Sequence, residues 1–151
     1  MKPADVTTAQ LSDVEAIQGL VREAYEPYIE SIGRAPAPLE ADYQGIVGEG
    51  RALIARRGGQ IVGLLITAIH SDHVLVENVA VAASEQGIGL GTSLLALADD
   101  QARQAGVSEV HLYTNEKMVK NIAFYSRRGF KETGRRTEDG FFRVFFTRLV
   151  D

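Results

Sequence analysis

The residues best suited to chemistry in this sequence lie in a glycine-rich stretch at positions 86–92. Gly87, Gly89 and Gly91 alternate with other residues, so ligands can approach the backbone N–H groups closely and unusual φ values cost little. Where such a stretch opens a helix, unpaired N–H groups and the helix dipole both favour negative charge. The stretch therefore predicts a site for a phosphate group, and the alternative is a glycine-rich connection that binds nothing.

The elements on either side must position this stretch. Residues 73–81 have the β-branched character of a strand, and residues 91–105 form a predicted helix. The apolar residues that support the helix recur at helical spacing, and they are Leu90, Leu94 and Leu97. The order strand, glycine turn, helix brings bare amides to a helix N-terminus.

The spacing of the glycines separates the candidate ligands. A dinucleotide motif needs Gly-x-Gly-x-x-Gly, but Thr92 occupies the third glycine's place, and the lysine of a P-loop is absent. The order Gln86-x-x-Gly89-x-Gly91 resembles the pyrophosphate-binding motif of the GNAT superfamily, the acyl-CoA-dependent N-acetyltransferases. Arginine is common where this chain has Gln86, so pyrophosphate binding here would rest on amides and the Thr92 hydroxyl.

A second resemblance covers residues 121–130, which look like the family's aromatic-Tyr-x-x-x-Gly-Phe segment. In many members that tyrosine faces the thioester sulfur. Attack by an amine expels a thiolate, and a phenol with a pKa of about 10 is a suitable proton donor. The resemblance therefore implies that Tyr125 is the general acid, and the alternative is a tyrosine that packs a helix end.

The resemblance also implies how acetyl-CoA, the expected cosubstrate, is bound. Backbone atoms of the strand ending at Val81 would hold pantetheine, and the glycine turn would hold the pyrophosphate. The predicted set is Val79, Ala80, Val81, Gln86, Gly87, Ile88, Gly89, Leu90, Gly91, Thr92, Asn115, Asn121 and Phe124. The chain departs from the family's Asn-x-x-Ala pattern, because Met118 stands in the asparagine's place. Asn121 and Asn115 are therefore alternative pantetheine contacts, and Asn115 could instead cap a helix.

An ammonium acceptor must lose a proton before it attacks, so a base is needed, directly or through water. Glu77 lies within the strand before the glycine turn and is our candidate, the alternative being a solvent-facing charge. His70 and His73 flank a predicted turn. Their His-x-x-His spacing suggests a metal pair, but without a third ligand we expect no metal.

Acceptor selection in this family usually comes from the segment between the first two helices and from the last hairpin. The expected acceptor-selecting residues are Tyr25, Tyr28, Ile32, Arg34 and Asp42, with Phe142 and Arg143 on the hairpin, and Tyr28, Ile32 and Arg34 are the expected substrate contacts. Arg34 could hold a substrate carboxylate through two hydrogen bonds, or be an exposed loop arginine. The acceptor amine itself stays open.

Composition limits the function classes. The chain has 151 residues, 45% of them hydrophobic and 24% charged, which fits one globular domain over residues 1–151. Lys plus Arg is 16 against 20 for Asp plus Glu, so the net charge of −4 argues against nucleic acid as a partner. Cysteine is absent, which excludes disulfides and a cysteine nucleophile. No apolar run resembles a signal peptide or a membrane span, so the expected location is cytoplasmic.

The predicted element order is β-α-α-β-β-β-α-β-α-β-β. It begins with a strand over residues 2–7 and a helix from a Ser12–Glu15 capping box to Tyr25, followed by a helix over 39–47. The remaining elements are strands over 52–57, 61–70 and 73–81, the helix over 91–105, a strand over 109–114, a helix over 117–128, and strands over 130–137 and 141–150. A face of Val119, Ile122, Ala123 and Ser126 is expected to pack the helix over 117–128.

This order also resembles the GNAT fold over essentially the whole chain. The resemblance implies a single α/β domain with a mixed, mostly antiparallel sheet flanked by helices. It also implies that the strands ending at Val81 and Thr114 run parallel and splay apart, leaving backbone groups for pantetheine to pair with.

The expected function is therefore an N-acetyltransferase acting on a small-molecule or peptide amine, without a covalent enzyme intermediate. A non-catalytic acyl-CoA-binding regulatory module is the main alternative, and a nucleotide-binding regulatory domain is disfavoured by the glycine spacing. A homodimer is common in the family.

Overall fold

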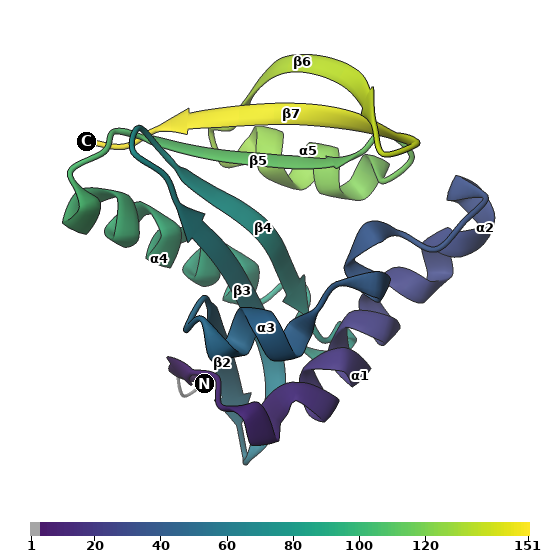
Figure 1. Cartoon of the computed structure of the whole chain (residues 1–151), viewed down its shortest axis with the longest axis vertical. Coiled ribbons are helices and arrows are strands. Elements are labelled where there is room, and N and C mark those ends of the chain that lie inside the picture. Colours follow the sequence, from purple (N-terminus) through teal and green to yellow (C-terminus); the bar gives the residue numbers. More distant parts are fainter. Residues whose placement is uncertain (1–3) are drawn as a thin grey trace. The chain divides into compact units, whose positions relative to one another are not determined.

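The computed structural model describes residues 4–151, and these contain one mixed sheet with helices beside it. The strand order within that part of the chain is β1-β2-β3-β4-β5-β7-β6 (Figure 1). The strands are β1 (Asp5–Thr8), β2 (Ala52–Arg57), β3 (Gln60–Ile69), β4 (Val74–Val81), β5 (Glu109–Asn115), β6 (Lys131–Glu138) and β7 (Phe141–Leu149). The α-helices are α1 (Val14–Tyr25), α2 (Ile29–Ile32), α3 (Tyr43–Gly48), α4 (Leu90–Ala105) and α5 (Val119–Arg127). Short 3₁₀ helices are η1 (Leu11–Asp13), η2 (Glu26–Tyr28), η3 (Ala37–Glu40) and η4 (Ala83–Glu85).

These elements confirm the predicted fold class. Neighbouring strands are antiparallel in the pairs β1–β2, β2–β3, β5–β7 and β6–β7, whereas β4 and β5 are parallel. The parallel ladder joins residues 74–76 to residues 110–112, and β4 and β5 continue beyond it to Val81 and Asn115. The chain divides into two compact units, which are described in turn.

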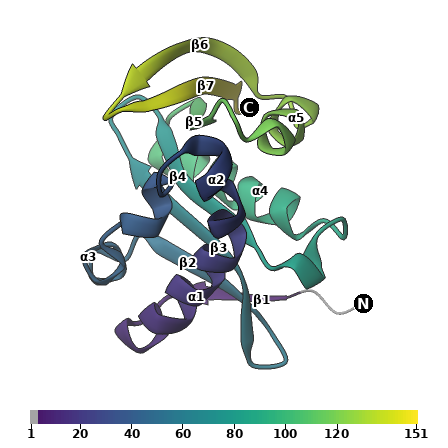
Figure 2. The same cartoon turned by 90° about the vertical axis from the view of Figure 1, so that its right-hand side faces the viewer.

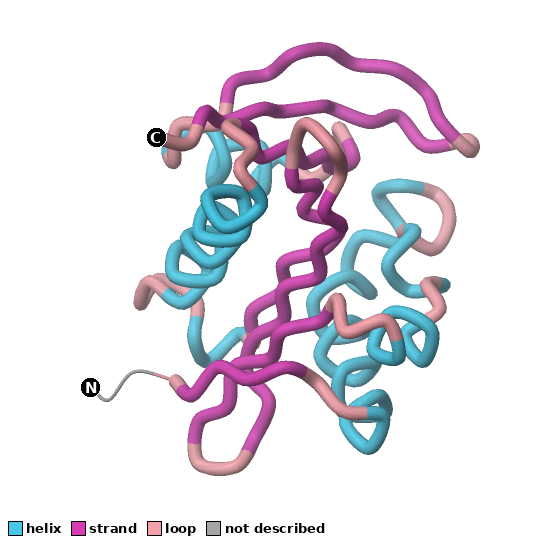
Figure 3. The backbone as a smooth tube through the Cα atoms, turned by 60° about the vertical axis from the view of Figure 1, so that its left-hand side comes forward, coloured by secondary structure: helices cyan, strands magenta, loops and turns pink. Residues whose placement is uncertain are grey.

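The first unit comprises Met1–Thr67 and Asn78–Leu95. Its central feature is the β2–β3 hairpin, which turns at Gly58 and Gly59 with φ of 60° and 82°, as the paired glycines predict. Helices α1 and α3 lie on one side of this hairpin and the start of α4 on the other (Figure 3). The buried face of α1 follows helical spacing, with Ile17 and Val21 almost fully enclosed.

Gly63 on β3 lets the start of α4 approach the sheet. A Cβ added to Gly63 would lie 3.1 Å from the side chains of both Leu90 and Leu94. Leu90 and Leu94 are buried, as the predicted spacing requires, whereas Leu97 is only half-buried and Leu95, which was not predicted, is buried. The contact fixes the N-terminal turns of α4, and with them the end of the glycine-rich stretch.

The second unit comprises Ala68–Glu77 and Ala96–Asp151. Here β5 pairs with β7 along the whole length of β5, β6 pairs with β7 and is joined to it by the Asp139–Gly140 turn, and α5 lies beside these strands (Figures 1 and 2). One face of these strands is apolar and enclosed, with Val110, Leu112 and Phe146 each at most 2% exposed.

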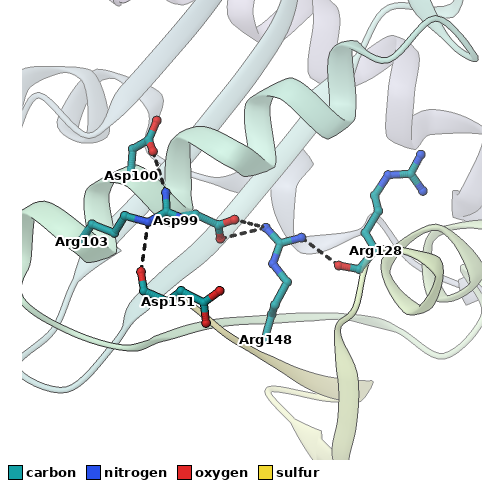
Figure 4. A network of polar contacts seen from close by, with 6 residues as sticks. All are labelled: Asp99, Asp100, Arg103, Arg128, Arg148 and Asp151. Atoms are coloured by element: carbon teal, nitrogen blue, oxygen red, sulfur yellow. Dashed lines mark hydrogen bonds and ion pairs between the residues drawn. The ribbon is translucent and has the colours of Figure 1, made fainter.

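A polar network ties the C-terminal part of α4 to β7 in this unit (Figure 4). Arg148 donates from Nη2 to both carboxylate oxygens of Asp99, at 2.8 and 2.9 Å, and from Nη1 to the Arg128 carbonyl at 2.9 Å. Its guanidinium carbon also lies 4.4 Å from the centre of the Phe130 ring. Such a two-pronged pair fixes the geometry of the parts it joins.

Three local predictions are wrong. The Asp13 carboxylate accepts from the Gln10 N–H at 2.8 Å, so a turn of 3₁₀ helix, and not a Ser12–Glu15 box, opens α1. The predicted helix over 39–47 is instead η3 and α3, separated at residues 41–42, because Ala41 is extended and Asp42 caps α3 by accepting from the Gly45 N–H. The predicted strand over 2–7 begins at Asp5 in the structure, and residues 2 and 3 lie outside the described residues.

A further local prediction that is wrong concerns the packing face of α5. Tyr125 is buried, whereas Val119 is 68% exposed and Ala123 and Ser126 are also exposed. The tyrosine ring contacts Phe130 and Phe146, and this aromatic cluster sets which side of the short helix faces the strands.

Candidate functional site

The glycine stretch forms a connection from β4 to α4. After β4 ends at Val81, η4 leads into a turn over residues 86–89, and α4 begins at Leu90. Gly87 and Gly89 have φ of 81° and 92°, in the left-handed region that side chains disfavour. A Cβ added at either glycine would meet no other atom within 4 Å. The glycines are therefore required by the backbone conformation, and the space beside them is open.

The first turn of α4 supplies the donors that an anion needs. The Gly89 carbonyl accepts from the Ser93 N–H at 3.0 Å, which is the first intrahelical bond. Helix geometry leaves the N–H groups before Ser93 without an intrahelical acceptor, and the dipole of a 16-residue helix adds positive potential there. The predicted members Gln86, Gly87, Ile88 and Gly89 are all exposed. This turn can bind a diphosphate through its backbone.

β4 leads into this turn, and one buried side chain ties it to the helical segment of the first unit. The Tyr25 hydroxyl donates to Asn78 Oδ1 at 2.8 Å, and Asn78 Nδ2 donates to the Tyr43 hydroxyl at 3.4 Å. Tyr43 in turn donates to the Pro38 carbonyl at 2.5 Å. Burial raises the pKa of Tyr43 to about 12, so this hydroxyl stays protonated and donates. Asn78 thus fixes both ends of the segment that contains Tyr28, Ile32 and Arg34.

We expect the substitution Asn78→Leu to lower the free energy of unfolding by about 2 kcal/mol, because the buried hydrogen bond from the Tyr25 hydroxyl to Asn78 is lost. Urea denaturation of Asn78→Leu, Tyr25→Phe and the double variant gives the measurement. The double variant should lose less than the sum of the single losses. Additive losses would show that the interaction between Tyr25 and Asn78 does not contribute to stability.

The predicted acceptor-binding residues lie between α1 and α3. Tyr28 ends η2, Ile32 ends α2, and Arg34 follows the left-handed Gly33 (φ 85°). Tyr28 and Ile32 are half-buried, whereas Arg34 is exposed. The two half-buried side chains leave part of their surface free for a ligand.

Tyr125 is the predicted general acid, and in the second unit it is 6% exposed. Its ring meets Phe124, Phe130 and Phe146 with centroids 5.6, 5.9 and 6.1 Å away. Burial raises the pKa of the Tyr125 phenol, so the hydroxyl carries its proton throughout the physiological range. A proton donor must hold its proton until the leaving group takes it, and this environment ensures that.

The two alternative asparagines have different surroundings. Asn115 Oδ1 accepts from the Lys117 N–H at 2.9 Å, so its side chain is used in the turn that precedes α5. Asn121, on α5, is half-buried and directs Nδ2 toward the Met118 sulfur at 3.9 Å. A sulfur is a weak acceptor, so Asn121 is the freer of the two to exchange its partner for a ligand amide. Phe124 is half-buried beneath the Arg128 guanidinium, whose carbon lies 3.6 Å from the ring centre.

Glu77 directly follows the parallel ladder on β4, and its position suggested the role of a base. The structure adds an unpredicted neighbour, Tyr113 on β5. Burial raises the pKa of Tyr113, the Arg143 guanidinium 4.4 Å above its ring opposes this, and the Glu77 carboxylate adds to it. Glu77, Tyr113 and Arg143 therefore share one electrostatic environment in the second unit. The sequence signal that could have identified Tyr113 is the alternation along β5, which puts it on the face opposite Val110 and Leu112.

The histidines form a stack in place of a metal site. The His73 ring lies 4.7 Å from that of His70 and 3.9 Å from that of His111, and both pairs are near parallel. His73 Nδ1 lies 2.6 Å from Asp72, and His111 Nε2 lies 2.8 Å from Glu109. Across residues 4–151, no group of three or more His, Asp or Glu is arranged to hold a metal ion.

Comparison of the sequence with known proteins indicates the family to which the chain belongs. Residues 17–130 match the family model described as Acetyltransferase (GNAT) family. The chain is 35% identical over 86 residues to an IAA acetyltransferase of Azospirillum brasilense, covering 56% of each protein. It is 34% identical over 86 residues to an aminoalkylphosphonate N-acetyltransferase of Salmonella typhimurium, covering 53% of this chain and 56% of that protein. The chain thus spans about half the length of the curated relatives it matches.

Solved structures share the fold. The chain is similar to a PaiA N-acetyltransferase of Thermoplasma acidophilum in complex with coenzyme A, with a TM-score of 0.80, 16% identity, and coverage of 98% of this chain and 99% of that one. An N-acetylglutamate synthase of Neisseria gonorrhoeae, complexed with coenzyme A and N-acetyl-glutamate, has a TM-score of 0.75 and 20% identity. All of this chain aligns with 36% of that synthase. At such identities the likeness shows the fold alone. Among the described helices, none is both long and apolar enough to cross a membrane.

Proposed function

Since the chain belongs to the GNAT family of acetyltransferases, we propose that it transfers the acetyl group of acetyl-CoA to a primary amine of a small molecule or peptide. The observation that carries this proposal is the turn over residues 86–89. Its two left-handed glycines open directly onto the N-terminus of α4. The Gln86 N–H donates to the Ala83 carbonyl at 3.3 Å, and the exposed amides that follow it suit the diphosphate of a coenzyme A ester. Residues 1–151 would act as one N-acetyltransferase domain.

In this proposal the chain's own groups have separate roles. Amides of residues 86–91 bind the diphosphate, with Thr92 and Gln86 beside them. Backbone groups of Val79, Ala80 and Val81 pair with the amides of pantetheine, and a backbone N–H polarises the thioester carbonyl. Asn121, or Asn115 in its place, and Phe124 line the pantetheine. Neither a metal nor a covalent enzyme intermediate is required.

The transfer is a direct attack. The acceptor amine, once deprotonated, adds to the thioester carbonyl, and the C–S bond breaks to release the thiolate of CoA. Glu77 accepts the proton of the ammonium through a water, and Tyr125 gives its proton to the thiolate sulfur. The nitrogen loses a second proton as the amide forms, and that proton, passed through solvent, restores the Tyr125 phenol. The burial that raises the pKa of Tyr125 makes the phenolate short-lived, which favours turnover.

The proposal is tested by mixing the protein with acetyl-CoA and a panel of amines while the release of free thiol is followed. The panel should include a polyamine, amino acids, a peptide N-terminus, a lysine peptide and an aminoalkylphosphonate, the class named for the Salmonella relative. Calorimetric titration with CoA provides the binding measurement. Binding of CoA without acetylation of any amine would favour the non-catalytic acyl-CoA-binding module, and absence of CoA binding would overturn both.

The substitution Glu77→Gln should lower kcat by about tenfold at neutral pH, since the amide cannot accept the proton. The rate should recover as pH rises and more of the acceptor is already deprotonated. The measurement is a pH profile of kcat for the wild type, Glu77→Gln and Glu77→Asp. Glu77→Asp keeps a carboxylate and should keep most of the rate. A profile for Glu77→Gln that matches the wild type would assign the proton transfer to another group.

A further inference from the structure

A partly buried ion pair adjoins the glycine turn, and neither member was predicted to contribute to the site. Glu85, the last residue of η4, has a side chain that is only 6% exposed. Arg57, the last residue of β2, donates from Nε to both Glu85 oxygens at 3.0 Å and from Nη2 to Oε1 at 2.8 Å. The two residues are 28 positions apart in the sequence, so the pair joins the turn to a distant strand.

This pair holds a segment that has little stability of its own. The 3₁₀ helix η4 has three residues, and the turn over 86–89 that follows it is exposed. At the other end of η4, the Ala82 N–H donates to the Val62 carbonyl at 2.8 Å. Arg57 and Val62 lie on either side of the Gly58–Gly59 turn, so the β2–β3 hairpin holds η4 at both ends.

The charges of Glu85 and Arg57 also affect how the neighbouring turn binds an anion. A carboxylate directly before a diphosphate-binding turn would repel the ligand if its charge were not balanced. The guanidinium of Arg57 balances that charge and, through its planar fork, fixes the direction of the carboxylate. A buried carboxylate without such a partner is strongly disfavoured.

We propose that Arg57 and Glu85 are a positioning pair that holds the amides of residues 86–91 in the geometry required for the diphosphate of CoA. The inference rests on the proposed function and extends it to residues that do not touch the ligand. It makes a distinctive prediction about charge. Glu85→Gln removes a negative charge near an anion site, so a purely electrostatic role would raise affinity, whereas a positioning role lowers it.

The test is calorimetric titration of CoA into the wild type, Glu85→Gln and Arg57→Gln. We expect the Kd to rise about tenfold for Glu85→Gln, and further for Arg57→Gln, which also leaves the carboxylate unbalanced. Acetyl-pantetheine lacks the diphosphate. In both variants the KM for acetyl-CoA should rise and kcat should change little. Their kcat/KM for acetyl-pantetheine should stay near the wild-type value, because this substrate has no diphosphate for the turn to bind.

Asp99→Asn is the matched control, because in the second unit Asp99 also accepts through both carboxylate oxygens from an arginine, the Nη2 of Arg148. Asp99→Asn, Glu85→Gln and Arg57→Gln should all lower the Tm, but Asp99→Asn should leave the Kd for CoA unchanged. If Arg57→Gln or Glu85→Gln does not fold, Arg57→Lys keeps the charge without the fork and should raise the Kd by a smaller factor. In Arg57→Lys the backbone amides of residues 86–91 should also exchange hydrogen faster than they do in the wild type.

The outcomes distinguish failure of the proposed function from failure of the positioning role of Arg57 and Glu85. A wild type that does not bind CoA overturns the proposed function. A wild type that binds, with folded variants binding within twofold of it, overturns the positioning role alone. An equal loss of affinity in Asp99→Asn would show general destabilisation and also overturn it, as would tighter binding by Glu85→Gln.

Discussion

Replacing Tyr125 with phenylalanine is expected to lower kcat by about 10²-fold or more and to leave the Kd for CoA nearly unchanged. The ring keeps its contacts with Phe130 and Phe146, so only the hydroxyl and its proton are lost. The measurement combines steady-state kinetics with calorimetric titration of CoA.

Phe130→Leu is the packing control for this prediction, because it loosens the same aromatic cluster and keeps the phenol. It should lower the Tm and reduce kcat far less than Tyr125→Phe does. Burial raises the pKa of Tyr125 above its ordinary value of about 10, so the wild-type rate should not fall as pH approaches 10. Turnover by Tyr125→Phe equal to that of the wild type would remove the phenol from the mechanism.

The double substitution Gly87→Ala/Gly89→Ala is expected to raise the Kd for CoA by about 100-fold. Each alanine would have to adopt a left-handed φ, which costs roughly 1–2 kcal/mol for a residue with a Cβ. The turn relieves this strain by changing conformation, and its amides then no longer converge on one anion. Calorimetric titration of CoA measures the change.

The chain provides a matched control for the strain itself. Gly50 and Gly106 also have positive φ, 73° and 74°, and also have no atom within 4 Å of an added Cβ. Gly50→Ala/Gly106→Ala should therefore lose comparable stability and keep the wild-type Kd. If the control loses CoA affinity to the same degree, the effect at Gly87 and Gly89 is one of folding and not of ligand geometry.

These experiments also separate the enzyme from the binding module. Both functions need the glycine turn, so both lose CoA affinity in Gly87→Ala/Gly89→Ala. Only the enzyme needs the Tyr125 hydroxyl and a proton acceptor such as Glu77. A protein that binds CoA and acetylates an amine, and loses only the second property in Tyr125→Phe, fits the enzyme alone.

Much of the fold could be predicted because its signals are local. The paired glycines at 58–59 and the Asp139–Gly140 dipeptide mark hairpin turns by their tolerance of positive φ, and both turns are observed. The repeat of Leu90 and Leu94 predicted the buried face of α4. The prediction failed where packing between residues distant in the sequence decides which face of a helix is buried. On α5 the aromatic contacts of Tyr125 with Phe146 outweigh the apolar face that begins at Val119.

By itself the sequence determined the order of the elements, the glycine turn and the identity of a phenol near a Gly-Phe pair. Each depends on residue type and on neighbours a few positions away. Only the tertiary structure revealed that Arg57 reaches Glu85, that Asn78 joins Tyr25 to Tyr43, and that Tyr113 shares its surroundings with Glu77. These contacts join residues between 28 and 53 positions apart, and their energies depend on burial, which a local pattern does not encode.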